Sequence, residues 1–205
     1  MNELEKEMDE KSSLPMECLD RLFNLARTPR SWLNRDVESS VLYQLYDLVK
    51  MGPTSANCQP ARFTFLSHPV SKEKLRPALT DGNIDLALSA PVIVIVAYDP
   101  IFYEKLPILY PAVELRSWYA GDMTFAEETA LRNSTLQGGY MIVAARSLGL
   151  DVAPLSGFDN TMVDRLFFEE QGWHSNFLIC LGYGNKENIG ERNERLAFEE
   201  ACLML

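Results

Sequence analysis

The sequence predicts an α+β fold in which helices outnumber strands. Apolar residues recur at helical spacing in several long stretches, whereas the run 91–97 (PVIVIVA) is continuous and β-branched, as in a strand buried on both faces of a sheet. The 205 residues contain no Gly/Ser-rich linker and no internal repeat. We therefore expect one domain over 15–205, preceded by a charge-rich extension over 1–14.

Helical periodicity appears in 16–26, 37–51, 125–148 and 161–169. The second of these stretches ends at Gly52-Pro53, which stops a helix. The stretch 125–148 is apolar nearly all round in its second half, which indicates a buried helix: either the central helix of a monomer or a helix at a subunit interface. Gly138-Gly139 costs this helix about 1 kcal/mol per glycine, so we expect another backbone to pass close there.

Strand patterns occupy 62–66, 91–97 and 176–183, and the second should be central. Between the last two lies 99–122, which is rich in aromatic residues and proline and too irregular for one element. It is either a lid over a pocket or a cover for the edge of the sheet.

Composition excludes several classes of partner. A net charge of −10 argues against nucleic acid or an anionic membrane. Apolar runs such as 90–97 are far shorter than the ~20 residues of a membrane helix, and the acidic start lacks a signal-peptide core, so we expect a cytoplasmic protein. The cysteines are scattered and only two histidines occur, so we expect neither a metal site nor a disulfide framework.

The segment 52–63 (GPTSANCQPARF) is a polar, proline-bounded loop between a helix pattern and a strand pattern. It places the hydroxyl and amide groups of Thr54, Ser55, Asn57 and Gln59 within a few residues of one another. The loop either cradles a ligand or is an ordinary turn whose side chains bond their own backbone.

Several familiar catalytic motifs are absent: the chain has no GxGxxG after a strand, no Walker loop, no GxSxG and no HExxH. Groups suited to binding phosphate remain at both ends, in Arg27, Thr28 and Arg30 and in Arg192 and Arg195. Taken singly, each arginine is more commonly a solvated surface residue.

Four segments in order resemble the FMN-dependent nitroreductase family. Segment 26–32 (ARTPRSW) is similar to its RRSxRxF element and 53–60 (PTSANCQP) to its PSSxNxQP loop. Segment 153–159 (APLSGFD) is similar to the part beside the flavin ring, and 181–183 with Arg195 to the carboxyl-terminal end. Further likenesses, in 75–79, 102–107, 116–118, 132–134 and 198–202, indicate the branch that contains malonic semialdehyde reductase of pyrimidine degradation.

The resemblance implies a mixed sheet flanked by helices, a homodimer, and FMN at the subunit interface. Carried over by position, the FMN phosphate would be held by Arg27, Thr28, Arg30 and Arg195, with Arg192 as a weaker candidate. The ribityl chain and ring would contact Thr54, Ser55, Asn57, Asn83, Leu155, Ser156 and Gly157, the last two through backbone N–H groups near flavin N5. The sequence departs from the family at Ala26, Ala61, Leu86 and Ser156.

The implied activity is a ping-pong reaction in which NADH or NADPH reduces FMN and a small semialdehyde acid then takes the hydride. We expect Arg116, next to an aromatic pair, to orient the acceptor's carboxylate. Two alternatives stay open: a nitro- or quinone reductase of broad specificity, and a non-catalytic flavin-binding protein, for which the departures argue.

Overall fold

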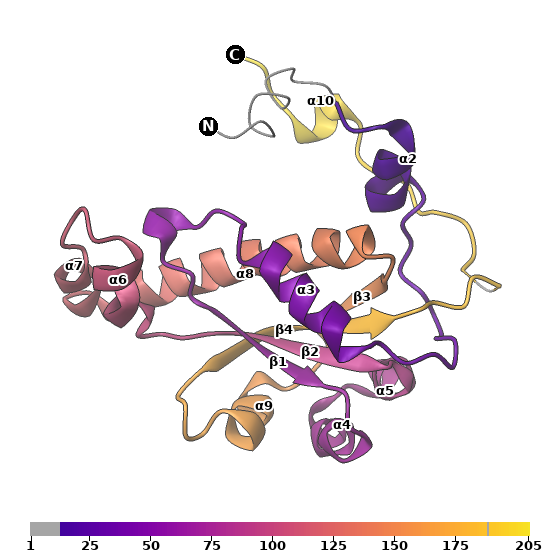
Figure 1. The fold of residues 1–205 in the computed structure, drawn as a ribbon, viewed down its shortest axis with the longest axis horizontal. Helices are drawn as coiled ribbons and strands as arrows, with labels where there is room; N and C mark the ends of the chain where they lie inside the picture. Colours follow the sequence, from indigo (N-terminus) through magenta and orange to yellow (C-terminus); the bar gives the residue numbers. More distant parts are fainter. Residues whose placement is uncertain (1–12, 188) are drawn as a thin grey trace.

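The computed structural model describes residues 13–187 and 189–205, and it forms three layers, with a sheet between two layers of helices (Figure 1). The predicted extension 1–14 lies almost entirely outside the described residues. The sheet has the order β1-β2-β4-β3, from β1 (Ala61–Leu66), β2 (Val92–Tyr98), β3 (Asp151–Leu155) and β4 (His174–Gly182).

The α+β class is confirmed, but the expectation of a mixed sheet is wrong for the described chain. All of its pairings are antiparallel: β1 with β2, β2 with β4, and β3 with β4. All seven residues of β2 are buried, as predicted for the central strand. Strand β1 lies at one edge and β3 at the other, which matters for the candidate site below.

One face of the sheet is covered by α3 (Ser39–Val49) and α8 (Met123–Ser147) (Figure 1). Asp122 begins α8 by accepting a hydrogen bond from the N–H of Phe125 at 3.0 Å. A core of Leu45, Val94, Met141 and Ile179 fills this interlayer space. The predicted helices 37–51 and 125–148 are thereby confirmed.

Within the single chain, one face of α8 is buried and the other, which includes Leu136 and Tyr140, is exposed. The expectation of a buried helix is therefore confirmed for the first face only. The prediction for its glycine pair also needs correction. A Cβ on Gly138 would lie 2.4 Å from Cζ of Phe177, a side chain rather than a backbone. A Cβ on Gly139 would have no neighbour within 4 Å.

The opposite face is covered by α4 (Pro69–Leu75), η3 (Arg76–Ala78), α5 (Asp81–Ser89) and α9 (Asn160–Phe167). Asp159 caps α9 by accepting from the N–H of Met162 at 2.9 Å. Leu75, Ile95 and Leu178 belong to the hydrophobic core that packs this layer of helices against the sheet.

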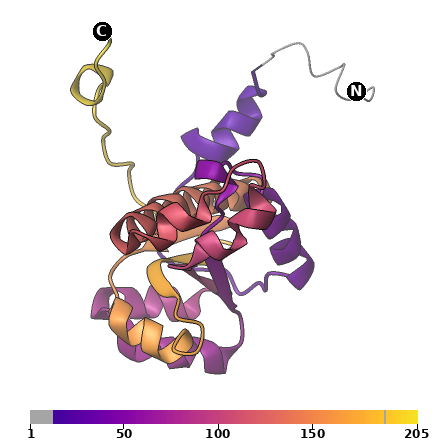
Figure 2. The same cartoon turned by 90° about the vertical axis from the view of Figure 1, so that its left-hand side faces the viewer.

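The aromatic excursion 99–122 folds into η4 (Phe102–Lys105), α6 (Leu106–Leu109) and α7 (Arg116–Ala120), beside the start of α8 (Figure 2). Its own core is aromatic: the ring of Phe102 lies 5.0 Å from that of Tyr119. Since Phe102 and Leu106 are fully or nearly fully buried, the segment is firmly packed and not an isolated flap.

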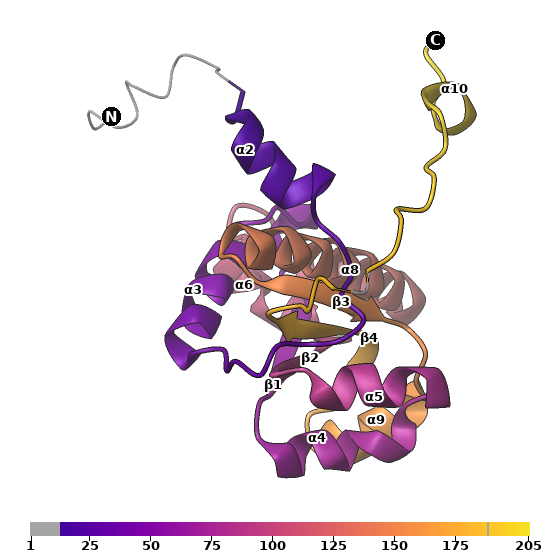
Figure 3. The same cartoon turned by 90° about the vertical axis from the view of Figure 1, so that its right-hand side faces the viewer.

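Both ends of the described chain lead away from the body on the side of α8 (Figure 3). The amino-terminal segment contains α2 (Met16–Leu19), continued by the π-helical turn η1 (Asp20–Asn24), and the carboxyl-terminal segment contains α10 (Phe198–Ala201). None of the helices within 13–187 and 189–205 has the length and apolarity needed to cross a membrane.

Candidate functional site

The polar loop between α3 and β1 has a strained backbone. Ala56, Asn57 and Gln59 have φ angles of 49°, 50° and 41°, in the left-handed region that residues with a Cβ rarely adopt. Each such residue costs on the order of 1–2 kcal/mol. Strain of this kind persists only where surrounding contacts impose it.

Two buried side chains of α8 impose the loop's conformation. The N–H of Ser55 donates to Oδ1 of Asn133 at 2.9 Å, and the N–H of Ala61 donates to Oε1 of Gln137 at 3.0 Å. Asn133 and Gln137 are 6% and 4% exposed, so the bonds are shielded from water. The sequence analysis missed both residues.

The loop's own side chains are partly used within the fold. Asn57 donates through Nδ2 to the carbonyl of Leu109 at 2.9 Å, and Oγ1 of Thr54 accepts from the N–H of Gln59 at 3.2 Å. The bond to Thr54 is that of an ordinary turn, whereas the bond from Asn57 ties the loop to α6; Ser55 is exposed. The neighbouring Cys58 is buried, which raises the pKa of its thiol to about 11. That thiol is therefore neutral at pH 7 and unsuited to nucleophilic attack.

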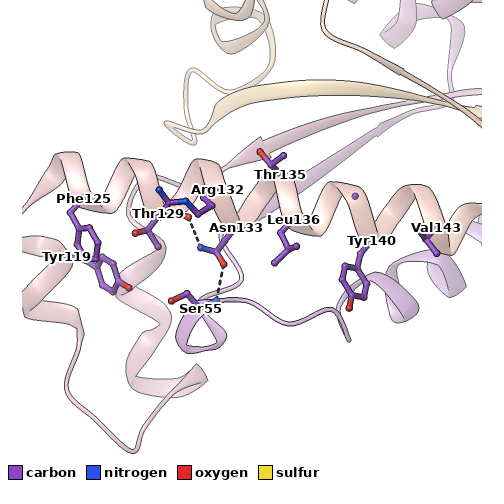
Figure 4. Close-up of a pocket in the computed structure, with 11 residues that line it drawn as sticks. Ser55, Tyr119, Phe125, Thr129, Arg132, Asn133, Thr135, Leu136, Tyr140 and Val143 are labelled. Atoms are coloured by element: carbon purple, nitrogen blue, oxygen red, sulfur yellow. Dashed lines mark hydrogen bonds between the residues drawn. The ribbon is translucent and has the colours of Figure 1, made fainter. Parts of the chain in front are cut away.

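Along the outer face of α8 runs a cavity of about 1030 Å³, which we call the α8 groove (Figure 4). Its lining residues are Ser55, Tyr119, Phe125, Thr129, Arg132, Asn133, Thr135, Leu136, Gly139, Tyr140 and Val143. The rings of Tyr119 and Phe125 stack at 5.1 Å with 4° between their planes. The groove thus presents aromatic and aliphatic surface beside the hydroxyl group of Ser55 in the polar loop.

A second cluster lies where β3 ends and α5 begins. The carbonyl of Gly157 accepts from Oγ1 of Thr80 at 2.9 Å and from Nδ2 of Asn83 at 3.0 Å. A Cβ on Gly157 would lie 2.4 Å from that Nδ2, so any side chain there would have to displace the amide of Asn83. The structure therefore brings together the predicted residues Asn83 and Gly157, with Ser156 exposed beside them and Leu155 at the end of β3.

The predicted phosphate-binding arginines mostly bond backbone carbonyls. Arg27 donates to the carbonyls of Ile189, Gly190 and Glu191, at 3.4, 3.2 and 2.9 Å. In return, Arg192 donates through Nη2 to the carbonyls of Asn24 and Ala26, at 2.7 and 2.8 Å. These reciprocal bonds join the two ends of the chain, and we call them the terminal clasp.

The remaining phosphate candidates have freer side chains. Arg195 donates only to the carbonyls of Asn193 and Glu194, its own neighbours, at 2.9 Å each. Thr28 and Arg30 are exposed and form no hydrogen bond or ion pair with other described residues. Trp32, two residues after Arg30, donates through Nε1 to the carbonyl of Leu86 at 2.9 Å, which holds this segment against α5.

The candidate residues for the ribityl chain and the ring therefore fall into two sets that one chain does not unite. The polar loop precedes β1 and contacts α8, whereas Asn83 and Gly157 lie beyond β3 on the side of α5. Strands β1 and β3 are the two edges of the four-stranded sheet. Three strand spacings separate them, roughly 14 Å, and the sets lie on opposite faces.

Arg116, predicted to orient a carboxylate, is engaged by Glu104. Its Nε and Nη2 contact the two carboxylate oxygens at 2.8 and 2.6 Å, in a bidentate pair on the surface. Arg116 borders a small cavity of about 180 Å³ rather than lining the α8 groove. A substrate carboxylate would have to displace Glu104 to reach it.

Comparison with known proteins gives consistent matches. Residues 25–183 match the sequence model of the nitroreductase family. A Ralstonia nicotianae protein named "Putative NADH dehydrogenase/NAD(P)H nitroreductase" is 50% identical over 193 residues, 94% of this chain and 99% of that protein.

Solved structures share the fold. A Bacillus subtilis protein described as a "putative nitroreductase" superposes with a TM-score of 0.83 at 21% identity, over 93% of this chain and 100% of that one. An Exiguobacterium sibiricum protein described in the same words, solved in complex with FMN, gives a TM-score of 0.77 at 17% identity, over 96% and 99% of the two chains.

Proposed function

Because this chain belongs to the nitroreductase family, we propose that it is an FMN-dependent oxidoreductase that passes hydride from NADH or NADPH to a small semialdehyde acid. The family and the name of the Ralstonia relative support the oxidoreductase class and the nicotinamide donor. Malonic semialdehyde, reduced to its hydroxy acid, is the acceptor that the scattered sequence likenesses favour.

The observation that carries the cofactor assignment is the cluster around Gly157. Its carbonyl accepts hydrogen bonds from the side chains of Thr80 and Asn83, and the absence of a Cβ leaves room for the amide of Asn83. Its N–H donates to no other described residue. A free N–H on a fixed backbone is the donor that a flavin ring nitrogen or oxygen needs. The residues present therefore fit FMN.

Most of the predicted residues have a role in this proposal. Arg30, Thr28 and Arg195 would bind the phosphate, whereas Arg27 and Arg192 hold the segments that carry them. Asn83 and Gly157 would position the ring, and the polar loop would cover it. When bound, FMN accepts and releases the hydride, and reduction of the aldehyde also takes up one proton.

We further propose that the active form is a homodimer. A two-fold axis brings the polar loop of one copy to the Asn83 and Gly157 cluster of the other, which unites the two sets that a single chain keeps apart. The end of the α8 groove that contains Leu136 and Tyr140, both more than 40% exposed, supplies apolar surface for such contact. Sedimentation of the holoprotein tests this: a monomer with a full complement of FMN would contradict it.

A nitro- or quinone reductase of broad specificity is the second candidate. The stacked rings of Tyr119 and Phe125 favour it, because aromatic walls accept planar acceptors. The argument for a non-catalytic role is that the sequence departs from the family at positions such as Leu86. That side chain packs against the core below the sheet, so its position has a structural use here.

The decisive experiment is an anaerobic visible spectrum of the purified protein before and after NADH or NADPH. We expect a flavin spectrum that bleaches with nicotinamide and recovers when a semialdehyde acid is added. Recovery only with nitroaromatics or quinones would favour the second candidate. A flavin spectrum that does not bleach would favour the non-catalytic role, and colourless protein that FMN cannot reconstitute would refute the cofactor assignment.

The prediction for Arg116 is tested in the same assay. If this arginine leaves Glu104 to bind the acceptor, Arg116→Ala raises the KM for the semialdehyde acid. An unchanged KM contradicts that role.

A further inference from the structure

We propose that Arg132 of α8 binds the carboxylate of the acceptor and so selects acidic substrates. The inference rests on the proposed function, whose acceptor is a semialdehyde acid. It assigns the recognition of that acid to a residue in the α8 groove, whereas the expectation from the sequence was Arg116, outside that groove.

The position of Arg132 is set by the periodicity of α8. Phe125, Thr129, Arg132, Leu136 and Tyr140 follow one another at steps of three or four residues, so they form one stripe along the helix. All line the α8 groove (Figure 4). Arg132 therefore sits in the middle of a stripe that is otherwise aromatic, aliphatic or uncharged.

The charge of the groove points to an anionic ligand. Among the described residues that line it, Arg132 is the one with a formal charge, and none is Asp or Glu. The whole chain has a net charge of −10, so a large cavity that is lined by one arginine and by no acidic residue is locally distinct.

The guanidinium of Arg132 is also available. It forms no hydrogen bond or ion pair with any other described residue, and Glu128, one turn earlier, makes no ion pair with it. Arg62, Arg76 and Arg116, by contrast, contact Asp99, Glu73 and Glu104 at 2.6 to 2.7 Å. A substrate carboxylate can take both arms of the Arg132 fork without displacing a resident carboxylate.

The polar loop supplies a second group beside Arg132. Asn133, the next residue, fixes the N–H of Ser55 at 2.9 Å, so the exposed Ser55 is held at the same groove. A short acid bound between these residues has its charged end on α8 and its polar remainder near the loop.

The test compares a three-carbon semialdehyde acid with propanal, which has the same length and no carboxylate. Holoenzymes of the wild type, Arg132→Gln, Arg132→Lys, the control Arg76→Gln and the rival Arg116→Ala are assayed with both acceptors. Loss of a bond to a charged group predicts a KM for the acid that is about 10- to 100-fold higher in Arg132→Gln. We expect the KM for propanal and the bleaching by nicotinamide to be unchanged, partial rescue in Arg132→Lys, and wild-type behaviour in the control Arg76→Gln, whose arginine pairs with Glu73 outside the groove.

Equal losses on both acceptors, or no loss on either, would overturn the inference, as would a selective loss confined to Arg116→Ala. A binding readout separates this result from failure of the proposed function. If the wild type reduces neither aldehyde, malonate is titrated into the holoprotein while flavin fluorescence is followed. Malonate binding that is at least 10-fold weaker in Arg132→Gln would support the carboxylate site. Equal binding by both proteins, or no binding by the wild type, would reject it.

Discussion

Gly138 and Gly139 are adjacent on α8 yet should respond oppositely to replacement by alanine. A Cβ on Gly138 would lie 2.4 and 2.9 Å from two ring atoms of Phe177 and 3.4 Å from Cγ1 of Val96. Carbon atoms in contact prefer 3.5–4.0 Å, so the ring must move by roughly 1 Å. Gly138 is buried and the ring lies between α8 and the sheet, where overpacking costs about 1–3 kcal/mol.

Alanine also gains about 1 kcal/mol over glycine in a helix interior. Gly138→Ala should therefore lose up to about 2 kcal/mol of unfolding free energy after this gain. Gly139→Ala meets no atom within 4 Å, so the single chain keeps the whole gain. The two variants should differ by about 1–3 kcal/mol although they make the same chemical change on one helix.

Urea denaturation followed by far-ultraviolet circular dichroism measures the difference. Each variant is unfolded at several protein concentrations, because Gly139 lines the α8 groove and an added methyl there weakens any dimer contact. Extrapolation to low concentration isolates the single chain. Equal stability of the two variants would refute the packing of Phe177 against Gly138.

Three further predictions concern the site and its thiols. Gly157→Ala should weaken FMN binding at least 10-fold, because its Cβ would push Asn83 aside; equilibrium dialysis measures this, and unchanged retention contradicts it. In the native protein iodoacetamide should label the exposed Cys202 at pH 7.5 and spare Cys58, whose buried thiol has a pKa of about 11; peptide mass mapping reads the labels, and rapid labelling of Cys58 would show the polar loop to be open. Stability should fall as pH rises above about 9, because burial raises the pKa of Cys180 from 9.0 to about 12 and the unfolded chain loses that proton first. Urea midpoints from pH 8 to 11 test this, with a shallower decline expected in Cys180→Ala.

The sequence was sufficient for the elements with strong local patterns. Strand β2 is a continuous β-branched run, and α8 has a long helical period bounded by Asp122. Strand β3 was missed because its DVAPL sequence is short and contains Pro154, a residue that the edge of a sheet tolerates. The mixed sheet was expected from the family resemblance alone; strand direction is set by long-range pairing, which is antiparallel throughout the described sheet.

The sequence identified several residues of the candidate site, but not the contacts that hold them in place. Composition and resemblance singled out the polar loop and Gly157, and the latter does contact Asn83. The side chains that hold the loop, Asn133 and Gln137, were missed because a buried amide on a helix has the same sequence signal as an exposed one. Likewise, Arg27 bonds carbonyls 162 or more positions away, which no local pattern encodes.

The terminal clasp means that the carboxyl-terminal segment holds the amino-terminal segment around Arg27 in place. Removing the chain after Lys186 would delete Arg192 and also the carbonyls that receive Arg27. The segment leading to Arg30 would then be tethered chiefly through Trp32. A shortened protein would therefore lose one proposed phosphate-binding residue, Arg195, and would also loosen the segment that carries the other two, Thr28 and Arg30.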